Sequence, residues 1–357
     1  MTRGRAAVIG RFFRKWFGRR APVLPVLPGP VAWPPFDAVP TEPTQAVDAM
    51  DTVDAADIED RFYRLVFGFP PSSARAPSFA EQAVLRRVRD AFGGERVDAA
   101  TLPRVGAILP LVMRSQRSDG PDARAVLAWI QSDPTLAGDI LRVANGPRYR
   151  RGHDVSTLAE AATAMGPDGM LREVARATVR PLLRSDAGPA SRLAGDRLWE
   201  HAERCAHACA VLHGADDMAL EPFLAGMVGH VAAQTVLAEL ARRDDMLGLE
   251  FSRPFVASLA RQVERLSLHA ARHWSFPSRV VQALAERADP ADAGARTPLG
   301  RALLAGSQLA MLDVLAEQGL VGTDAALLAT PRQGFGQATL GACRKTLRQR
   351  APAHLLT

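Results

Sequence analysis

The sequence predicts an all-α fold. Across its long segments, apolar residues recur three and four positions apart, the spacing of one helix face, rather than at every second position. Alanine, leucine and arginine, which favour helices, are abundant, and strand-forming residues are sparse by comparison. The chain has 357 residues, of which 47% are hydrophobic, enough to bury one large core or two smaller ones. We therefore expect a soluble bundle of many helices.

The first predicted element is a short basic amphipathic helix within residues 1–20. From Ile9 onward its apolar side chains are three and four residues apart, and basic residues fill the other positions. Such a helix can lie on an anionic membrane surface or dock in a groove of a partner, through Phe12, Phe13, Arg14, Lys15, Trp16 and Phe17. A solvated basic tail is the alternative, because isolated helices shorter than about 12–15 residues are marginally stable.

This N-terminal segment also accounts for the positive charge of the chain. The formal net charge is +6, but residues 1–20 hold seven of the 44 basic groups and no acidic one, which leaves 37 basic against 38 acidic groups elsewhere. A nucleic-acid-binding domain is expected to carry a basic stripe in its folded part, and no such stripe follows residue 20. We therefore expect no nucleic-acid partner for the body of the protein.

Residues 21–44 are predicted to be an extended linker. Eight of them are prolines, which exclude a helix and favour a polyproline-like spacer. With these prolines following, and with Arg14 and Lys15 interrupting the aromatic cluster, the N-terminus does not resemble a signal peptide. The three cysteines are too few for a disulfide framework and indicate a reducing compartment. The predicted location is therefore cytoplasmic, with peripheral contact to the inner membrane as the variant that residues 1–20 allow.

Residues 45–100 are predicted to be a helical lead-in. Ile58, Phe62 and Leu65 lie at helical spacing after an acidic run that suits the positive end of a helix. A second helix is expected to begin at Ser78, which forms a capping-box pattern with Glu81, and to end at the glycines that follow residue 92.

Residues 101–295 hold a succession of helix boundaries. Leu102 and Pro103 open the region, and further on Asp133 can cap a helix whose first position is Pro134. The same helix carries Leu136, and Asn145, followed by glycine and proline, is expected to end it in a left-handed conformation ahead of Tyr149. Thr157 and Glu160 form a second capping-box pattern, and Gly166 is expected to start the next link.

In this order, these motifs resemble the HDOD family, the HD-related output domains, and the resemblance extends more thinly to about Pro290. Gly146 stands where the family has serine, and Trp274 and Pro277 resemble its Trp-x-x-Pro turn, which we expect to pack between helices. The resemblance implies a helical domain of bacterial signal transduction, related to metal-dependent HD phosphohydrolases. Residues 296–357 would then form a C-terminal helical extension.

The positions that hold metal in hydrolytic relatives are altered here. His201 corresponds to their first histidine, on a first helix. A second helix, expected to run through residues 220–234, has Gly229 and His230 where the pattern has His-Asp, and Arg287-Ala288 replaces a later histidine pair. The resemblance therefore implies a vestigial cleft at His201, Gly229 and His230 with no catalytic residue and no metal. We interpret His230 as a core or cleft-edge histidine.

A second histidine-containing pattern is a ladder of His201, Cys205, Cys209 and His213, each four residues from the last. Two neighbouring members could share a zinc ion, because residues four apart lie on one helix face. The cysteines also fit an apolar stripe as small core residues, and this reading is favoured because no Cys-x-x-Cys pair completes a site.

The function predicted from the sequence is that of a non-catalytic regulatory or scaffold protein, without cofactors, that contacts signalling proteins in trans. A link to cyclic-di-GMP or two-component signalling is what the resemblance implies. The alternative is a divergent HD-type phosphohydrolase, which would need an acidic partner near His201.

Overall fold

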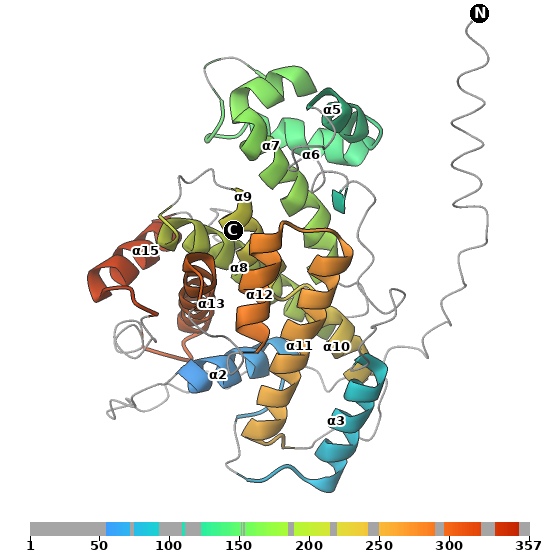
Figure 1. Ribbon diagram of the computed structural model, residues 1–357, viewed down its shortest axis with the longest axis vertical. Coiled ribbons are helices and arrows are strands. Elements are labelled where there is room, and N and C mark those ends of the chain that lie inside the picture. Colours follow the sequence, from blue (N-terminus) through green and yellow to red (C-terminus); the bar gives the residue numbers. More distant parts are fainter. Residues whose placement is uncertain are drawn as a thin grey trace, which may run out of the picture. The chain divides into compact units, whose positions relative to one another are not determined.

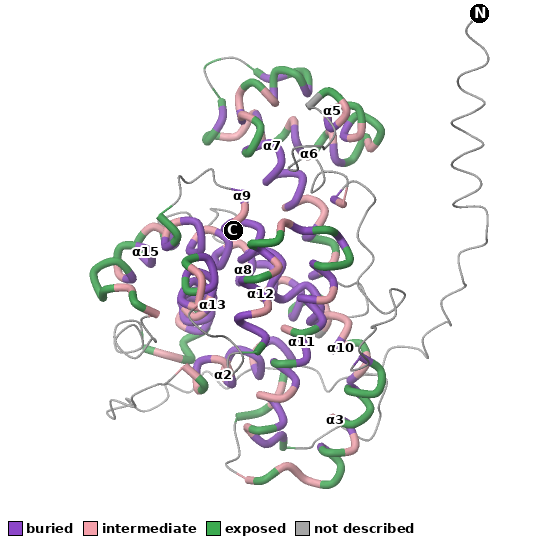
Figure 2. The backbone as a smooth tube through the Cα atoms, viewed as in Figure 1, coloured by how far each residue is buried: buried purple, intermediate pink, exposed green. Residues whose placement is uncertain are grey.

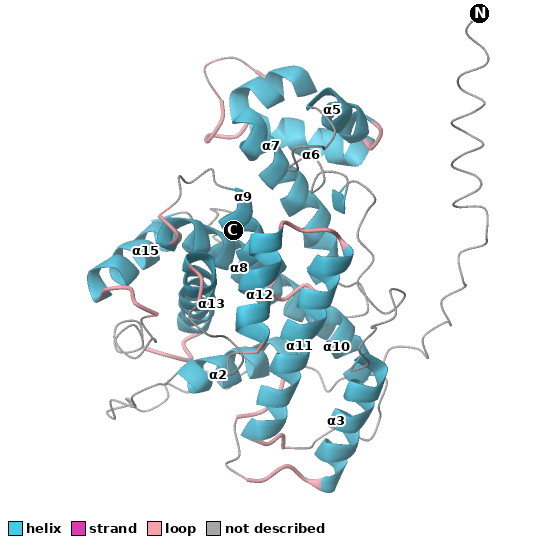
Figure 3. Ribbon diagram, in the orientation of Figure 1, coloured by secondary structure: helices cyan, strands magenta, loops and turns pink. Residues whose placement is uncertain are grey.

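We describe the fold from a computed structural model. The residues that the structure describes are 55–71, 75–92, 109–110, 123–150, 152, 154–184, 189–214, 220–241, 250–289, 296–322 and 333–349. All of them belong to one compact unit, Thr44–Thr357. The regular elements within these ranges are helices, which confirms the all-α prediction (Figures 1 and 3). They are α2 (Ala55–Phe67), α3 (Phe79–Phe92), α5 (Ala123–Gln131), α6 (Pro134–Ala144), α7 (Leu158–Leu183), α8 (Pro189–Leu212), α9 (Leu220–Val228), α10 (Ala233–Ala241), α11 (Arg253–His273), α12 (Ser278–Ala288), α13 (Pro298–Glu317) and α15 (Gln337–Gln349).

The predicted lead-in contributes two helices to this unit. The Ser78 hydroxyl accepts a hydrogen bond from the Glu81 backbone N–H at 3.3 Å, and the Glu81 carboxylate accepts one from the Ser78 N–H, so the predicted capping box begins α3. The other helix, α2, packs against α8, α11 and α13, and α3 packs against α11. The lead-in is therefore part of the same core as the region that follows.

Helix α6 begins as predicted, but the backbone conformation at its end differs from the one expected. Asp133 Oδ1 accepts from the N–H groups of Thr135 and Leu136, with Pro134 at the first position. At the other end Asn145 has φ −84°, so the expected left-handed conformation is wrong. Instead, its side-chain amide donates to the Val155 carbonyl at 2.8 Å and its Oδ1 accepts from the Val155 N–H at 2.8 Å. The Asn145 side chain thus links the end of α6 to the segment that precedes α7.

Helix α7 is long and kinked. It begins at the predicted capping box, in which the Glu160 N–H donates to the Thr157 hydroxyl at 3.2 Å. Gly166 then leaves helical geometry with φ 70° and ψ 169°, a conformation that is almost restricted to glycine, and the helix resumes at Pro167. Gly166 therefore separates two helical segments, as expected, although the chain continues with no intervening loop.

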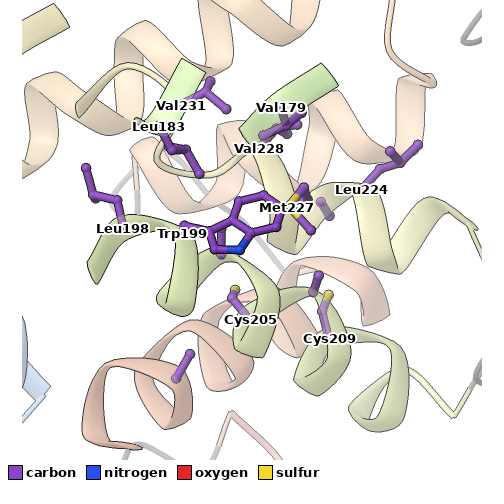
Figure 4. Packing of buried hydrophobic residues seen from close by; sticks show 14 of the residues in the cluster. Val179, Leu183, Leu198, Trp199, Cys205, Cys209, Leu224, Met227, Val228 and Val231 are labelled. Atoms are coloured by element: carbon purple, nitrogen blue, oxygen red, sulfur yellow. The ribbon is translucent and has the colours of Figure 1, made fainter. Parts of the chain in front are cut away.

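The centre of the core is formed by α8, α9 and α13, which pack closely on one another. Figure 2 shows these helices largely in purple, as buried segments. Figure 4 shows Trp199, Cys205 and Cys209 of α8 in one apolar cluster with Met227 and Val228 of α9. Helix α13 lies in the region that was predicted to be a C-terminal extension. That region therefore contributes to the core.

The helix that was expected to run through residues 220–234 is interrupted. It was expected to pass through Gly229 and His230, but α9 ends at Val228 and residues 229–232 form a turn before α10. This expectation was wrong because the apolar spacing continues through the turn, so that no local signal marks it. His230 therefore projects from a turn.

Helices α11 and α12 are joined by the predicted aromatic turn. Trp274 is the C-cap of α11 and is 2% exposed, and Pro277 precedes the first residue of α12. The predicted packing of this turn between helices agrees with the burial of Trp274.

Two stretches within the described ranges, Leu220–Leu240 and Pro298–Glu317, are long and apolar enough to cross a membrane. In each, 78% of the apolar window is buried inside the protein, which is what a core helix shows. Residues 1–44, with the predicted basic helix and linker, and the predicted Leu102-Pro103 opening lie outside the described residues.

Candidate functional site

The two histidines that the sequence places at the altered metal positions lie against each other. His201 projects from the middle of α8 and His230 from the turn after α9. Their ring centroids are 4.3 Å apart, with the rings nearly perpendicular at 84°. We call His201 and His230 the histidine pair. The structure therefore brings together the residues that the sequence predicted to share a site.

The histidine pair is buried, so the predicted cleft is not open. His201 is 0% and His230 1% exposed. Two adjacent aromatic residues of α2 cover the pair: the Phe62 ring centroid is 4.7 Å from that of His201, and the Tyr63 centroid is 5.9 Å from that of His230. The lead-in helix thus covers the histidine pair.

Arg287, at the end of α12, contacts His230 of the histidine pair and also interacts with Tyr63 of α2. Its Nη2 lies 2.8 Å from His230 Nε2, and its Nε donates to Glu264 Oε1 at 2.7 Å. A guanidinium has only donors, so His230 Nε2 must accept, and His230 is neutral with its proton on Nδ1. The lone pair with which this imidazole would bind a metal ion is therefore engaged by an internal cation.

Gly229 provides the space for this guanidinium. A Cβ atom at position 229 would lie 2.5 Å from Arg287 Nη1, closer than side-chain atoms approach each other. Gly229 stands in the position of the family's histidine and Arg287 in place of the later histidine pair. A side chain at position 229 would therefore require the guanidinium to shift.

His201 is held by α13. Its Nε2 lies 3.3 Å from the Ser307 backbone carbonyl and 3.5 Å from the Ser307 hydroxyl. The carbonyl can only accept, so a proton on this nitrogen satisfies the shorter of the two contacts. Burial and then the positive charge of Arg287 lower the pKa of His201 to about 3. Burial and then Arg287 also hold the pKa of His230 well below its usual 6.5. Both histidines are therefore uncharged at neutral pH.

Acidic groups surround Arg287 and keep it charged. Burial is the largest single effect and lowers the pKa of Arg287, but the Glu264 carboxylate beside it, together with smaller contributions from other neighbours, raises the pKa above its usual value. On α2, burial and the nearby Glu264 raise the pKa of Glu59 to about 7. Burial also raises the pKa of the Tyr63 hydroxyl well above 10. The site is therefore a buried polar cluster around one permanent cation.

The residues present do not fit a divalent metal ion. Among the residues that the structure describes, no three histidine, cysteine, aspartate or glutamate side chains are grouped so that they could hold one. The lone pair on His230 Nε2 is engaged by Arg287, and the guanidinium brings a positive charge to the place where a metal cation would need negative ligands. No hydrolytic step can be derived from this geometry.

The cysteines of the predicted ladder lie in the core. Cys205 and Cys209 are 0% exposed among the apolar residues of Figure 4, whereas His213, at the end of the ladder, is exposed. Burial raises the pKa of Cys205 to about 11 and that of Cys209 well above its usual value, so both stay as thiols. Their position agrees with the interpretation as small core residues.

The other motif residues lie away from the histidine pair and have local tasks. Asp133, Pro134 and Leu136 begin α6, which packs against α5 and α7, and Tyr149 is buried beyond its end. Gly166 forms the α7 kink, and Trp274 and Pro277 form the turn between α11 and α12. These residues position helices and do not contribute to the site.

Reasoning from the sequence missed Tyr63, Glu264 and the inward position of Arg287. The nearest signal was the exchange of a histidine pair for an arginine, combined with a glycine at position 229. Taken together, the added guanidinium at position 287 and the missing side chain at position 229 could have indicated that the guanidinium occupies the space of that side chain.

A family model described as HDOD domain matches residues 102–290. A solved structure of a candidate signal transduction protein from Marinobacter aquaeolei VT8 is 18% identical, with a TM-score of 0.50 over 76% of this chain and 63% of that one. A candidate metal-dependent phosphohydrolase from Shewanella amazonensis SB2B is 18% identical, with a TM-score of 0.49 over 75% of this chain and 98% of that one. An HDOD domain protein of unknown function from Geobacter sulfurreducens is 13% identical, with a TM-score of 0.47 over 76% and 98% of the two chains. No curated protein matches the chain.

Proposed function

The chain belongs to the HDOD domain family, whose model matches residues 102–290, and on that premise we propose that it is a non-catalytic regulatory protein of bacterial signal transduction that acts by binding other proteins.

The contact between Arg287 and His230 carries this proposal. An HD-type hydrolase activates water on divalent ions held by imidazoles and carboxylates. Here the 2.8 Å contact engages His230 Nε2 with a guanidinium, whose charge cannot be removed at physiological pH. A permanent cation at the metal position would repel the divalent ion that hydrolysis requires. The arginine at position 287 therefore suits a protein that retains the fold and does not hydrolyse phosphoesters.

The covering of the histidine pair supports the same proposal. Phe62 and Tyr63 are both 0% exposed, so neither solvent nor substrate reaches the two imidazoles while α2 is in place. A hydrolase needs a path for a phosphoester and for water. The structure around the histidine pair instead resembles a core, with an internal cation in place of a bound one.

The proposed partners are other signalling proteins acting in trans, and a connection to cyclic-di-GMP or two-component signalling is part of the proposal. Residues 1–20 would add contact with an anionic membrane surface, through the apolar and basic side chains named above. The competing function is a divergent metal-dependent phosphohydrolase.

Metal content and turnover distinguish the two functions. The full chain would be incubated with Mn²⁺, Zn²⁺ or Mg²⁺, desalted, analysed for bound metal and assayed with a chromogenic phosphodiester. We expect neither stoichiometric metal nor turnover above the rate of the buffer. Stoichiometric metal together with turnover that His201→Ala abolishes, and that the remote His213→Ala leaves unchanged, would overturn the proposal.

A further inference from the structure

Helix α2 lies across α8, α11 and α13 (Figure 1), and we call the surface of these helices that it covers the groove. It precedes the residues that the family model matches. We propose that α2 is a displaceable plug, and that the groove beneath it binds an acidic amphipathic helix of a partner protein in its place. This inference rests on the proposed function, because a scaffold can use this groove for a protein where a hydrolase would need it for a substrate.

The apolar part of the groove fits a helix with large anchors. The α2 residues that face it recur at helical spacing, in the way that amphipathic helices bind grooves in other proteins. Phe62 lies on both histidine rings, with centroid distances of 4.7 Å and 6.1 Å. The Tyr63 ring meets the Phe62 ring edge to face, with the centroids 5.6 Å apart. The residues of α2 that are buried are Ile58, Asp60, Phe62, Tyr63, Arg64, Val66 and Phe67.

Charge indicates which kind of helix fits. The first half of α2 is acidic, and arginines of the surrounding helices face it. Arg253 of α11 lies 3.8 Å from Asp57, which also pairs at 2.8 Å with Arg61 of α2 itself, and Asp60 pairs with Arg64 of α2. Burial and the Glu264 carboxylate raise the pKa of Glu59, and Arg287 and Arg261 oppose that rise. A helix that replaces α2 should therefore carry an acidic residue opposite Arg253, at the position of Asp57, before an adjacent pair of aromatic residues.

When α2 is docked, several polar atoms are buried without hydrogen-bond partners, which costs free energy. Asp60 Oδ1, His201 Nδ1 and His230 Nδ1 are buried with no hydrogen-bond partner among the residues that the structure describes. Each of these atoms would gain a partner in water if α2 left the groove. The Glu59 carboxyl would likewise recover its charge, because burial raises its pKa to about 7 while α2 is docked. These costs lower the free energy of local opening below that of global unfolding.

A labelled peptide with the sequence of residues 55–67 tests the groove directly. Its binding to the full chain would be measured by fluorescence anisotropy, with wild-type protein and with a Phe62→Ala/Tyr63→Ala variant whose own plug is weakened. We expect the variant to bind the peptide at least 10-fold more tightly than the wild type does. A Leu340→Ala/Leu347→Ala variant, which loses apolar contacts of α15 and keeps α2 intact, should bind as the wild type does. A peptide with serine at positions 62 and 63 should not bind.

Hydrogen exchange in the wild-type chain tests the same proposal without a mutation. We expect the amides of α2 to exchange at least 10-fold faster than the most protected amides of α13. Equal protection of the two helices would overturn the plug, as would a folded plug variant that binds the peptide no better than the wild type. Complete unfolding of the variant would also overturn it, because α2 would then be indispensable to the core. None of these experiments measures metal binding or turnover, so their outcome does not decide the non-catalytic role.

Discussion

At the scale of single residues, the central feature is the contact of Gly229, His230 and Arg287. The guanidinium is buried and lies between a neutral imidazole and the Glu264 carboxylate. A buried ion pair contributes little net stability compared with apolar residues of the same shape, yet the loss of one partner is costly because the other charge stays buried. The stability of the protein should therefore be sensitive to each member of this set.

We predict that Gly229 and Arg287 are energetically coupled. Gly229→Ala should cost about 1–3 kcal/mol, because the added methyl group forces the guanidinium away from its place. Arg287→Ala should cost about 3–5 kcal/mol, since Glu264 then keeps a buried charge without its partner. Denaturant unfolding of both single variants and the double variant measures the coupling.

In the double variant the methyl group should cost almost nothing, because truncation of Arg287 leaves room for it. Gly138→Ala is the matched control, since position 138 is an exposed helical glycine with no atom within 4 Å of an added Cβ. Strict additivity of the two changes would contradict the assigned contact.

The histidine pair predicts a dependence of stability on pH. The pKa of His201 is about 3 in the folded protein and that of His230 is also depressed, whereas unfolded histidines take up protons below about 6.5. Since the unfolded state binds more protons, stability should fall as the pH drops below 6.5, by up to about 1.4 kcal/mol per pH unit for each histidine. The raised pKa of Glu59 acts oppositely between pH 4.5 and 7.

A His201→Phe variant separates these effects, because it removes one histidine and keeps Glu59. Unfolding free energies at pH 7 and pH 5 should show a smaller acid-induced loss in the variant than in the wild type. Parallel losses would mean that His201 titrates normally in the folded protein. His269→Phe serves as the control, since that histidine is only partly buried.

At the scale of elements, helix starts could be predicted from the sequence and several helix ends could not. Asp133, Thr157 and Ser78 cap helices as predicted, because a cap depends on side chains and N–H groups that are two or three residues apart. The end of α9 at Val228 lies within a continuous apolar pattern and adjoins the buried guanidinium of Arg287, far away in the sequence. The Asn145 side chain likewise acts across ten residues.

Asn145 gives a prediction for its element. Asn145→Ala should destabilise the protein by about 1–3 kcal/mol, because the Val155 N–H and carbonyl lose their partner between α6 and α7. Asn145→Asp keeps the acceptor for the Val155 N–H but turns a carboxylate oxygen toward the Leu141 and Val155 carbonyls, so it should cost at least as much as alanine at pH 7. Thermal unfolding measures both variants, and an unchanged Asn145→Ala midpoint would contradict the bridging role.

At the scale of the whole molecule, the sequence predicted the family and the helical class but not how its segments combine. His201 and the Gly229-His230 step could be placed by resemblance, and the structure brings the two histidines together. The covering by α2 could not be predicted, since more than 130 residues separate Phe62 from His201 and no local pattern encodes the contact. The segments predicted as lead-in and extension contribute α2 and α13 to one unit, Thr44–Thr357.

The distribution of charge over the whole chain predicts membrane binding through residues 1–20. The full chain should bind vesicles that contain phosphatidylserine, more weakly as salt is raised, and deletion of residues 1–20 should abolish sedimentation with them. A Phe12→Ser/Trp16→Ser variant keeps every charge and should bind less than the wild type, because the apolar contact is lost. Vesicle binding that survives the deletion would contradict this prediction.

The most direct test of the central claim is the nuclear magnetic resonance spectrum of the full chain with nitrogen-15-labelled histidine, recorded with and without added Mn²⁺. If Arg287 replaces the metal, the side-chain nitrogens of His230 and His201 show two neutral rings, with His230 protonated on Nδ1 and His201 on Nε2. Both sets of signals should keep their positions and widths when one equivalent of Mn²⁺ is added. Selective broadening of the His230 and His201 signals by stoichiometric Mn²⁺ would show a metal site and contradict the account.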